Sequence, residues 1–127
     1  HANHPVLASE MAILKRAVDA YKEIQATIAN YVMNQKIRMM PLYATRILHA
    51  TGELVCGQLI LEQALVAQAK IDELGKDHYD YAFYNGKVNA ARYYLHNIVP
   101  NIFRTLEVIK DGDTSVLDIE EEAFLIF

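Results

Sequence analysis

Apolar residues recur every three or four positions along three long stretches of this 127-residue chain. Such spacing places them on one side of an α-helix, where they can pack against neighbouring helices. The chain has only 5 glycines and 3 prolines, so few residues would interrupt a long helix. Because 53% of its residues are hydrophobic, it can also build a hydrophobic core. We therefore predict an all-α fold: an up-down antiparallel bundle of three long helices plus a short C-terminal helix.

The first predicted helix spans about Val6 to Arg38, and the second spans about Leu42 to Leu74. Pro41 separates them, because the residue before a proline avoids the helical conformation and Met40 is then a natural break. The first helix carries one apolar stripe, which consists of Leu7, Met11, Leu14, Val18, Tyr21, Ile28 and Val32. The second is apolar around most of its circumference, which predicts that it is buried on several sides.

Small residues in the second predicted helix would let a neighbouring helix approach closely. They are Ala50, Gly52, Cys56 and Gly57. Cys56 is the only cysteine, so the chain has no internal disulfide. No basic residue lies near Cys56 in the sequence, so we expect a small buried residue and not a reactive thiol.

The third predicted helix covers about His78 to Lys110, with a bend at Pro100 because proline lacks the backbone N–H that the helix needs. A short fourth helix is expected to begin at Asp118, which would cap it together with Glu121 three residues later. We expect this last piece to close the bundle or to dock across its side.

Charge and hydropathy narrow the possible partners. The net charge is −4 and the basic residues form no run, which argues against nucleic acid and against a polybasic membrane contact. The longest apolar candidate, Leu54 to Ala69, is interrupted by polar side chains, so we predict no transmembrane segment. With no signal peptide visible, we expect a cytoplasmic protein.

Candidate chemistry within the chain is sparse. His49 and Glu53 lie one helical turn apart, but a metal site needs further ligands, and only His96 suggests itself. We therefore predict no catalytic, cofactor-binding or metal-binding residue in this chain. Exposed polar and aromatic side chains are more typical of contact surfaces, and the interface candidates are Arg46, His49, Arg92 and Tyr93.

The stretch from Lys87 to Pro100 reads KVNAARYYLHNIVP and resembles the extra C-terminal helical domain of large bacterial acyl-CoA dehydrogenases. The glycine-containing stretch Leu54 to Leu65 and the tail from Ser115 to Phe124 are similar to the same family. The likeness covers about Leu42 to Phe124. Gln58 departs from the family pattern, which often has tryptophan at that position.

This resemblance implies that residues 1–127 form a single domain at the C-terminus of a larger chain, in keeping with a sequence that begins with His1. In such enzymes the FAD, the acyl-CoA thioester and the catalytic carboxylate belong to preceding domains. The parent would remove hydrogens from the α and β carbons of an acyl-CoA. The domain would pack on the catalytic body and on a second subunit of a homo-oligomer. Two alternatives stay open: a free-standing helical interaction or regulatory module, and a metal- or ligand-binding helical bundle.

Overall fold

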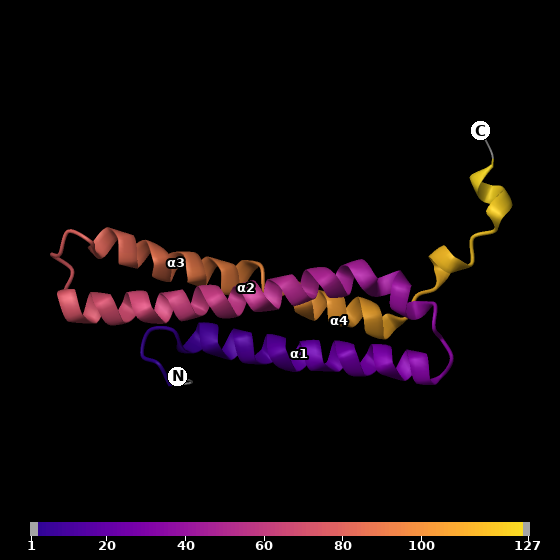
Figure 1. Cartoon of the computed structure of the whole chain (residues 1–127), viewed down its shortest axis with the longest axis horizontal. Helices are drawn as coiled ribbons and strands as arrows, with labels where there is room; N and C mark the ends of the chain where they lie inside the picture. Colours follow the sequence, from indigo (N-terminus) through magenta and orange to yellow (C-terminus); the bar gives the residue numbers. More distant parts are fainter. Residues whose placement is uncertain (1–2, 126–127) are drawn as a thin grey trace.

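Three antiparallel rods make up the molecule, which we describe over residues 3–125 of a computed structural model. Its α-helices are α1 (Ala8–Met33), α2 (Met39–Leu74), α3 (Tyr81–Asn97) and α4 (Asn101–Asp111). In Figure 1, α2 returns along α1, and α3 followed by α4 returns along α2. No strand occurs among residues 3–125. The predicted all-α up-down bundle is confirmed.

The first connection lies earlier in the chain than predicted. α1 ends at Met33 and α2 begins at Met39, so Pro41 lies inside the first turn of α2. Proline is tolerated there because the first backbone N–H groups of a helix have no partner within it. The prediction of a break at Met40 is therefore wrong. The turn instead uses Gln35, whose positive φ of 63° reverses the chain.

The predicted third helix is broken, not bent. α3 ends at Asn97 and α4 begins at Asn101, with Pro100 directly before α4. Pro100 cannot donate to the carbonyl of His96, so the regular hydrogen-bond series stops at this point. The backbone N–H of Val99 reaches back to the carbonyl of Tyr94 (3.1 Å), which forms a wider turn before α4 starts.

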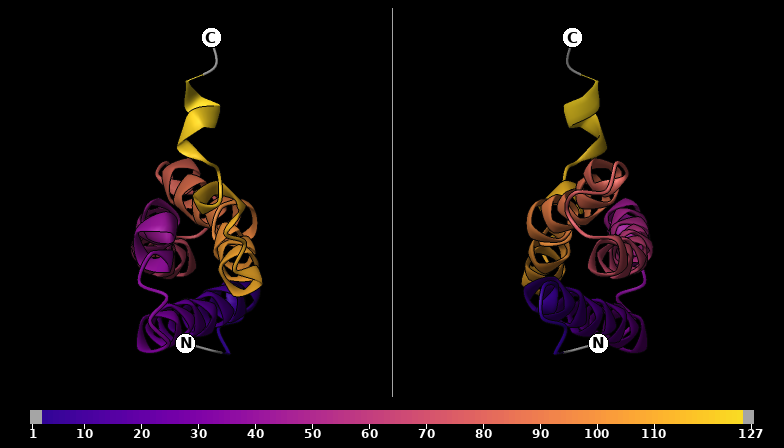
Figure 2. Two further views of the ribbon diagram at one scale, coloured as in Figure 1. Left: turned by 90° about the vertical axis from the view of Figure 1, so that its right-hand side faces the viewer. Right: turned by 90° about the vertical axis from the view of Figure 1, so that its left-hand side faces the viewer.

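The core lies between the three rods. Figure 2 shows the rods end-on. Every α-helix contributes buried apolar side chains, as do Leu7 directly before α1 and Val99 between α3 and α4. The largest fully buried side chains are Leu7, Ile24, Leu61, Leu95, Val99, Ile102 and Ile109. Small residues such as Ala17, Ala50, Ala64 and Ala91 are also buried and let the rods approach one another. The helical spacing of apolar residues thus produces the packing that it predicts.

The small residues of α2 have different roles. A Cβ atom added to Gly57 would lie 2.9 Å from Cγ2 of Val99, so close approach at this position is confirmed. A Cβ atom added to Gly52 would meet nothing within 4 Å, so the same prediction is wrong there. Cys56 is exposed, which overturns the expectation of a buried thiol.

The segment after α4 leaves the bundle. It forms two short 3₁₀ turns, Ser115–Leu117 and Glu121–Phe124, and projects away from the rods (Figures 1 and 2). Asp118 does not cap a helix; it ends the first turn, and its carboxylate accepts a hydrogen bond from the Thr114 hydroxyl (3.0 Å). The predicted short C-terminal helix is thus present as the 3₁₀ helix Glu121–Phe124, whereas the predicted cap at Asp118 and the docking of this piece on the bundle are wrong for residues up to 125.

Candidate functional site

A buried carboxylate joins the start of α1 to α3. Glu10 is only 2% exposed. Its Oε1 atom lies 3.5 Å from Nε of Arg92 and 3.3 Å from Nε2 of His96, and its Oε2 atom accepts a hydrogen bond from Ser9 (2.8 Å). Arg92 also donates to the backbone carbonyl of Val6 (3.1 Å). These contacts fix the N-terminal end of α1 against α3.

The environment of Glu10 favours its charged form. Burial alone would raise the pKa of the carboxyl group, because a low dielectric disfavours charge. Hydrogen bonds from Ser9, from the backbone and from His96, together with the charge of Arg92, outweigh burial and lower the pKa. The cluster therefore has the character of a structural ion pair, since a carboxylate held ionised in this way is a poor general acid.

Sequence reasoning missed Glu10, although a signal was present. Glu10 follows Leu7 by three positions and precedes Ala17 by seven, and both of those residues are fully buried. Its position therefore lies on the core face of α1. A glutamate in the first turn of a helix is also expected as an exposed residue, because the helix dipole favours negative charge there. The sequence alone does not distinguish a buried Glu10 from an exposed one.

The four interface candidates do not gather in one place. Arg46 and His49 are exposed on α2, and neither side chain forms a hydrogen bond or an ion pair with another of residues 3–125. Arg92 is committed to Glu10 and Val6. Tyr93 is 64% exposed on α3.

The residues considered for a metal do not converge. Glu53 accepts a hydrogen bond from Asn101 (3.4 Å), whereas His96 contacts Glu10. Within residues 3–125, no three His, Cys, Asp or Glu side chains are grouped so that they could hold a metal ion.

One face of α2 is apolar and bare. We call Leu48, Val55, Leu59 and Val66 the outer stripe; each is about half or more exposed. At 3.6 residues per turn they fall within a sector of about 40°, directly opposite the buried residues Ala50, Gly57, Leu61 and Gln68. Burial on several sides was predicted for this helix. Within residues 3–125, α1, α3 and α4 pack on it, and the outer stripe stays exposed.

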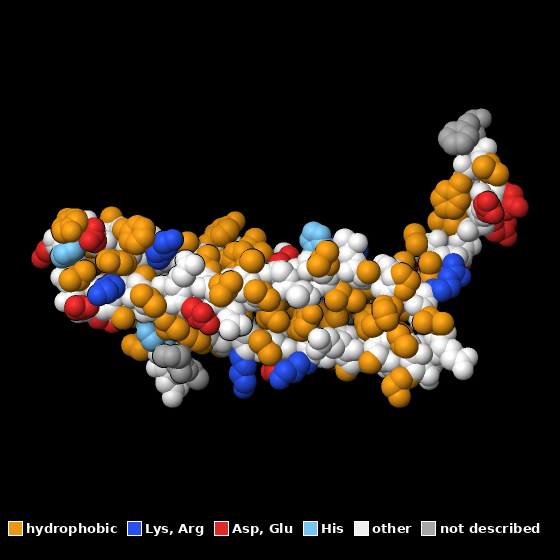
Figure 3. Space-filling view, in the orientation of Figure 1, with side chains coloured by type: hydrophobic (Ala, Val, Ile, Leu, Met, Phe, Trp, Pro, Cys, Tyr) orange, Lys and Arg blue, Asp and Glu red, His pale blue; other side chains and the backbone are white. Residues whose placement is uncertain are grey.

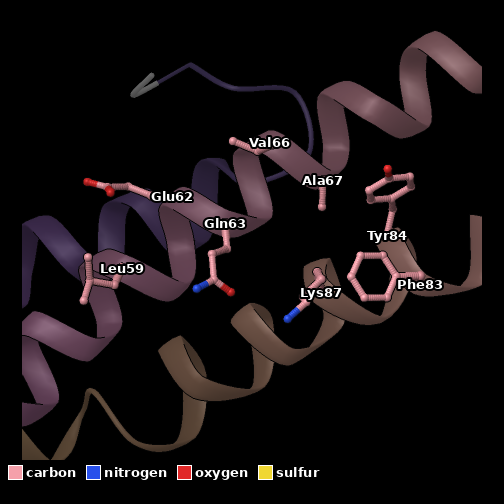
Figure 4. Close-up of a pocket in the computed structure, with 8 residues that line it drawn as sticks. All are labelled: Leu59, Glu62, Gln63, Val66, Ala67, Phe83, Tyr84 and Lys87. Atoms are coloured by element: carbon pink, nitrogen blue, oxygen red, sulfur yellow. The ribbon is translucent and has the colours of Figure 1, made fainter. Parts of the chain in front are cut away.

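A groove runs beside the outer stripe between α2 and α3. Its volume is about 610 Å³, and it is lined by Leu59, Glu62, Gln63, Val66, Ala67, Phe83, Tyr84 and Lys87. Figure 4 shows Gln63 and Ala67 directed toward α3, while Phe83 and Lys87 rise from α3 on the other side. The ammonium group of Lys87 lies 5.5 Å from the centre of the Phe83 ring. We call this the α2–α3 groove.

Two further apolar regions are exposed. A second groove of about 460 Å³ lies between α1 and α2 and includes Ile28, Met33 and Ile47. Figure 3 shows hydrophobic side chains between these two helices and on the projecting tail. The tail exposes Val116, Ile119, Phe124 and Leu125.

Length and composition would also allow α2 to cross a membrane, and 28% of its most apolar window is buried inside the bundle. Core helices of soluble proteins have the same composition, so this observation by itself is weak evidence for a bilayer.

The fold and its surfaces define an all-helical domain with apolar faces exposed for packing. The chain belongs to the family described as acetyl-CoA dehydrogenase C-terminal like, whose model matches residues 1–120. The predicted membership in the acyl-CoA dehydrogenase family, through its C-terminal helical domain, is confirmed.

Curated relatives agree with this assignment. Two butyryl-CoA dehydrogenases of Syntrophomonas wolfei are 45% and 40% identical over 121 residues, which is 95% of this chain. A broad-specificity linear acyl-CoA dehydrogenase of Mycobacterium tuberculosis, FadE5, is 32% identical over 123 residues, or 93% of this chain. The chain spans only 20% of the length of each of these relatives.

Proposed function

We propose that this chain is a non-catalytic docking domain of a larger, cytoplasmic FAD enzyme that dehydrogenates an acyl-CoA between its α and β carbons. Residues 1–127 would form a single domain of that enzyme. Its role would be mechanical: it buries apolar surface against the catalytic body and a neighbouring subunit and so stabilises the homo-oligomer. The observation that carries this proposal is the outer stripe of α2, which lies opposite the core and is uncovered.

Exposing a row of apolar side chains to water is unfavourable relative to burying it, by roughly 25 cal/mol for each Å² of apolar surface. Rows of this kind usually mark a contact surface. Lipid is a poor alternative partner, because Glu53 and Glu62 lie within the same helix. An acidic side chain at the centre of a bilayer costs about 2.5–3.5 kcal/mol. A protein partner would cover the stripe and leave the Glu62 carboxylate at a hydrated rim, while Glu53 keeps its hydrogen bond from Asn101.

The described residues do not fit FAD. Every buried side-chain nitrogen and oxygen of the described, non-exposed residues already has a hydrogen-bond partner, so none is free to hold a flavin ring or a pyrophosphate. In the α2–α3 groove the only charged side chains are Glu62 and Lys87. We therefore assign the flavin and the acyl-CoA to the rest of the parent enzyme and derive no chemical step from this domain.

Arg46, His49, Arg92 and Tyr93 remain our candidates for contacts with the body or the second subunit. The exposure of Tyr93 supports its place in this group, because a tyrosine supplies a large contact area with a polar end. Arg46 and His49 are also exposed and form no ion pair with residues 3–125. Arg92 has a second role, since it already holds Glu10.

The test compares the full-length enzyme with a version truncated before this domain. We expect the truncated enzyme to bind FAD, since the flavin site lies elsewhere, but to lose activity at a lower temperature and to assemble less completely. Flavin absorbance, thermal inactivation and size-exclusion chromatography with light scattering give these readouts. A truncated enzyme with unchanged thermal stability and unchanged assembly would refute the docking role and favour a separate interaction or regulatory module.

A further inference from the structure

We infer that the outer stripe and the α2–α3 groove together bind one amphipathic helix, which comes from the part of the same polypeptide that precedes this domain. The inference rests on the proposed function, because it names the surface and the partner through which docking would occur. Its support comes from the shape of the surface, the charges at its edges and the position at which the chain enters α1.

The stripe and the groove are one continuous surface. Leu59 and Val66 belong to both, and Leu48 and Val55 extend the surface along α2. At 1.5 Å per residue, the distance along the helix axis from Leu48 to Val66 is about 27 Å, or five turns. An α-helix laid along this surface could place apolar residues at positions i, i+4, i+7 and i+11 against it. The surface therefore has the length and the apolar spacing that suit a helix.

The two edges of the groove carry opposite charges. Lys87 lies on the α3 edge and Glu62 on the α2 edge, and Gln63 lies between them beside the apolar side chains of the groove (Figure 4). A partner helix would complement this arrangement with acidic residues toward α3 and basic residues toward α2. The reverse orientation would bring like charges together, which disfavours it. The expected partner is thus an apolar helix face with an acidic flank and a basic flank.

The position of the N-terminal end favours a partner in the same polypeptide. Arg92 donates a hydrogen bond to the backbone carbonyl of Val6. Along the axis of α3, Arg92 lies about 8 Å beyond Lys87, which lines the groove. The chain therefore enters α1 at the level of the groove, on the other flank of α3.

In the relatives, the matched fifth is the C-terminal part, so the rest of their sequence comes before it. A partner tethered there reaches an effective concentration in the millimolar range, which favours it over a second copy.

The test uses thiol labelling in the full-length holoenzyme. Val66→Cys places a thiol where the outer stripe and the groove overlap, and Met33→Cys places one at the far end of α1. The native side chains are 65% and 81% exposed in the domain, so both variants should fold. Maleimide labelling is followed for each cysteine by peptide mass spectrometry, which separates these thiols from Cys56 and any others.

We expect the thiol of Val66→Cys to react at least about ten-fold more slowly than that of Met33→Cys, because a covered thiol reacts only in the undocked fraction. After unfolding in urea both should react alike. Should Val66→Cys fail to fold, Phe83→Cys tests the α3 side of the same groove. Equal rates in the folded enzyme would overturn the inference.

If the thiol of Val66→Cys is protected in the enzyme but loses this protection when the enzyme is diluted into separate subunits, the occupant is a second copy. That result would also overturn the inference. If truncation of the domain destabilises the enzyme while Val66→Cys reacts freely, only this inference fails. If truncation has no effect either, the proposed function fails with it.

Discussion

The carboxylate of Glu10, near the start of α1, lies 3.5 Å from the guanidinium of Arg92 on α3, and it is almost fully buried. Removing Arg92 would leave this carboxylate with only Ser9 and His96 as side-chain partners. We predict that Arg92→Ala lowers the free energy of unfolding by about 1–3 kcal/mol, the usual cost of a buried polar group that loses a partner. Urea unfolding of the domain followed by circular dichroism measures this.

Lys110→Ala is the matched control. Lys110 pairs with Glu23 across α4 and α1 at 2.6 Å, but both side chains are about half exposed. Exposed pairs contribute only about 0–1 kcal/mol. Equal losses for the two variants would contradict the structural role assigned to the Glu10 cluster.

Acid should weaken the domain through Glu10. Folding lowers the pKa of Glu10 below its ordinary value of 4.5, so the unfolded state binds the proton more readily than the folded state. The stabilisation is complete above the unfolded pKa and is lost as the pH falls through the lowered folded pKa. We predict that, below about pH 4.5, the free energy of unfolding of Glu10→Gln falls less steeply with decreasing pH than that of the unsubstituted domain. Urea midpoints at several pH values test this, and an unchanged slope would contradict it.

Two glycines of α2 should respond in opposite ways to alanine. Gly52→Ala adds a methyl group in open space and favours the helix, so we predict a gain of about 0.5–1 kcal/mol. Gly57→Ala places its methyl group 2.9 Å from the buried side chain of Val99. Such overpacking typically costs about 1–3 kcal/mol, which exceeds the gain in helix propensity. Thermal melts of both variants provide the comparison, and stabilisation by Gly57→Ala would show that the contact between α2 and the segment after α3 is loose.

The bundle could be predicted from sequence because three-and-four spacing places a helix's apolar residues on its buried face. The predicted stripe from Leu7 to Val32 lies beside the core, although the most buried positions of α1 include Ala17 and Ile24. The helix ends were harder to predict. Pro41 is compatible with a break before α2 and also with the first turn of α2, and only the packing of Met39 and Tyr43 in the core selects the second.

The site could be predicted only in part. The apolar circumference of α2 predicts packing on several sides, and α1, α3 and α4 do pack on it, but the sequence does not show which side the bundle leaves bare. That depends on where α1 and α3 lie. The burial of Glu10 likewise depends on Arg92 and His96, which reach it only after folding. The tail helix was predicted from a capping pattern, but four of its apolar side chains stay exposed and give it little packing against the bundle: Val116, Ile119, Phe124 and Leu125.

Differential scanning calorimetry of the full-length enzyme tests most directly whether this domain acts by packing on its parent. We predict that the domain and the catalytic body unfold in one coupled transition. Val66→Asp puts a charge on the outer stripe. In this variant we expect a second transition at a lower temperature, the temperature at which the isolated domain melts. If the domain already melts independently in the unsubstituted enzyme, and Val66→Asp changes nothing, the domain does not stabilise its parent by docking.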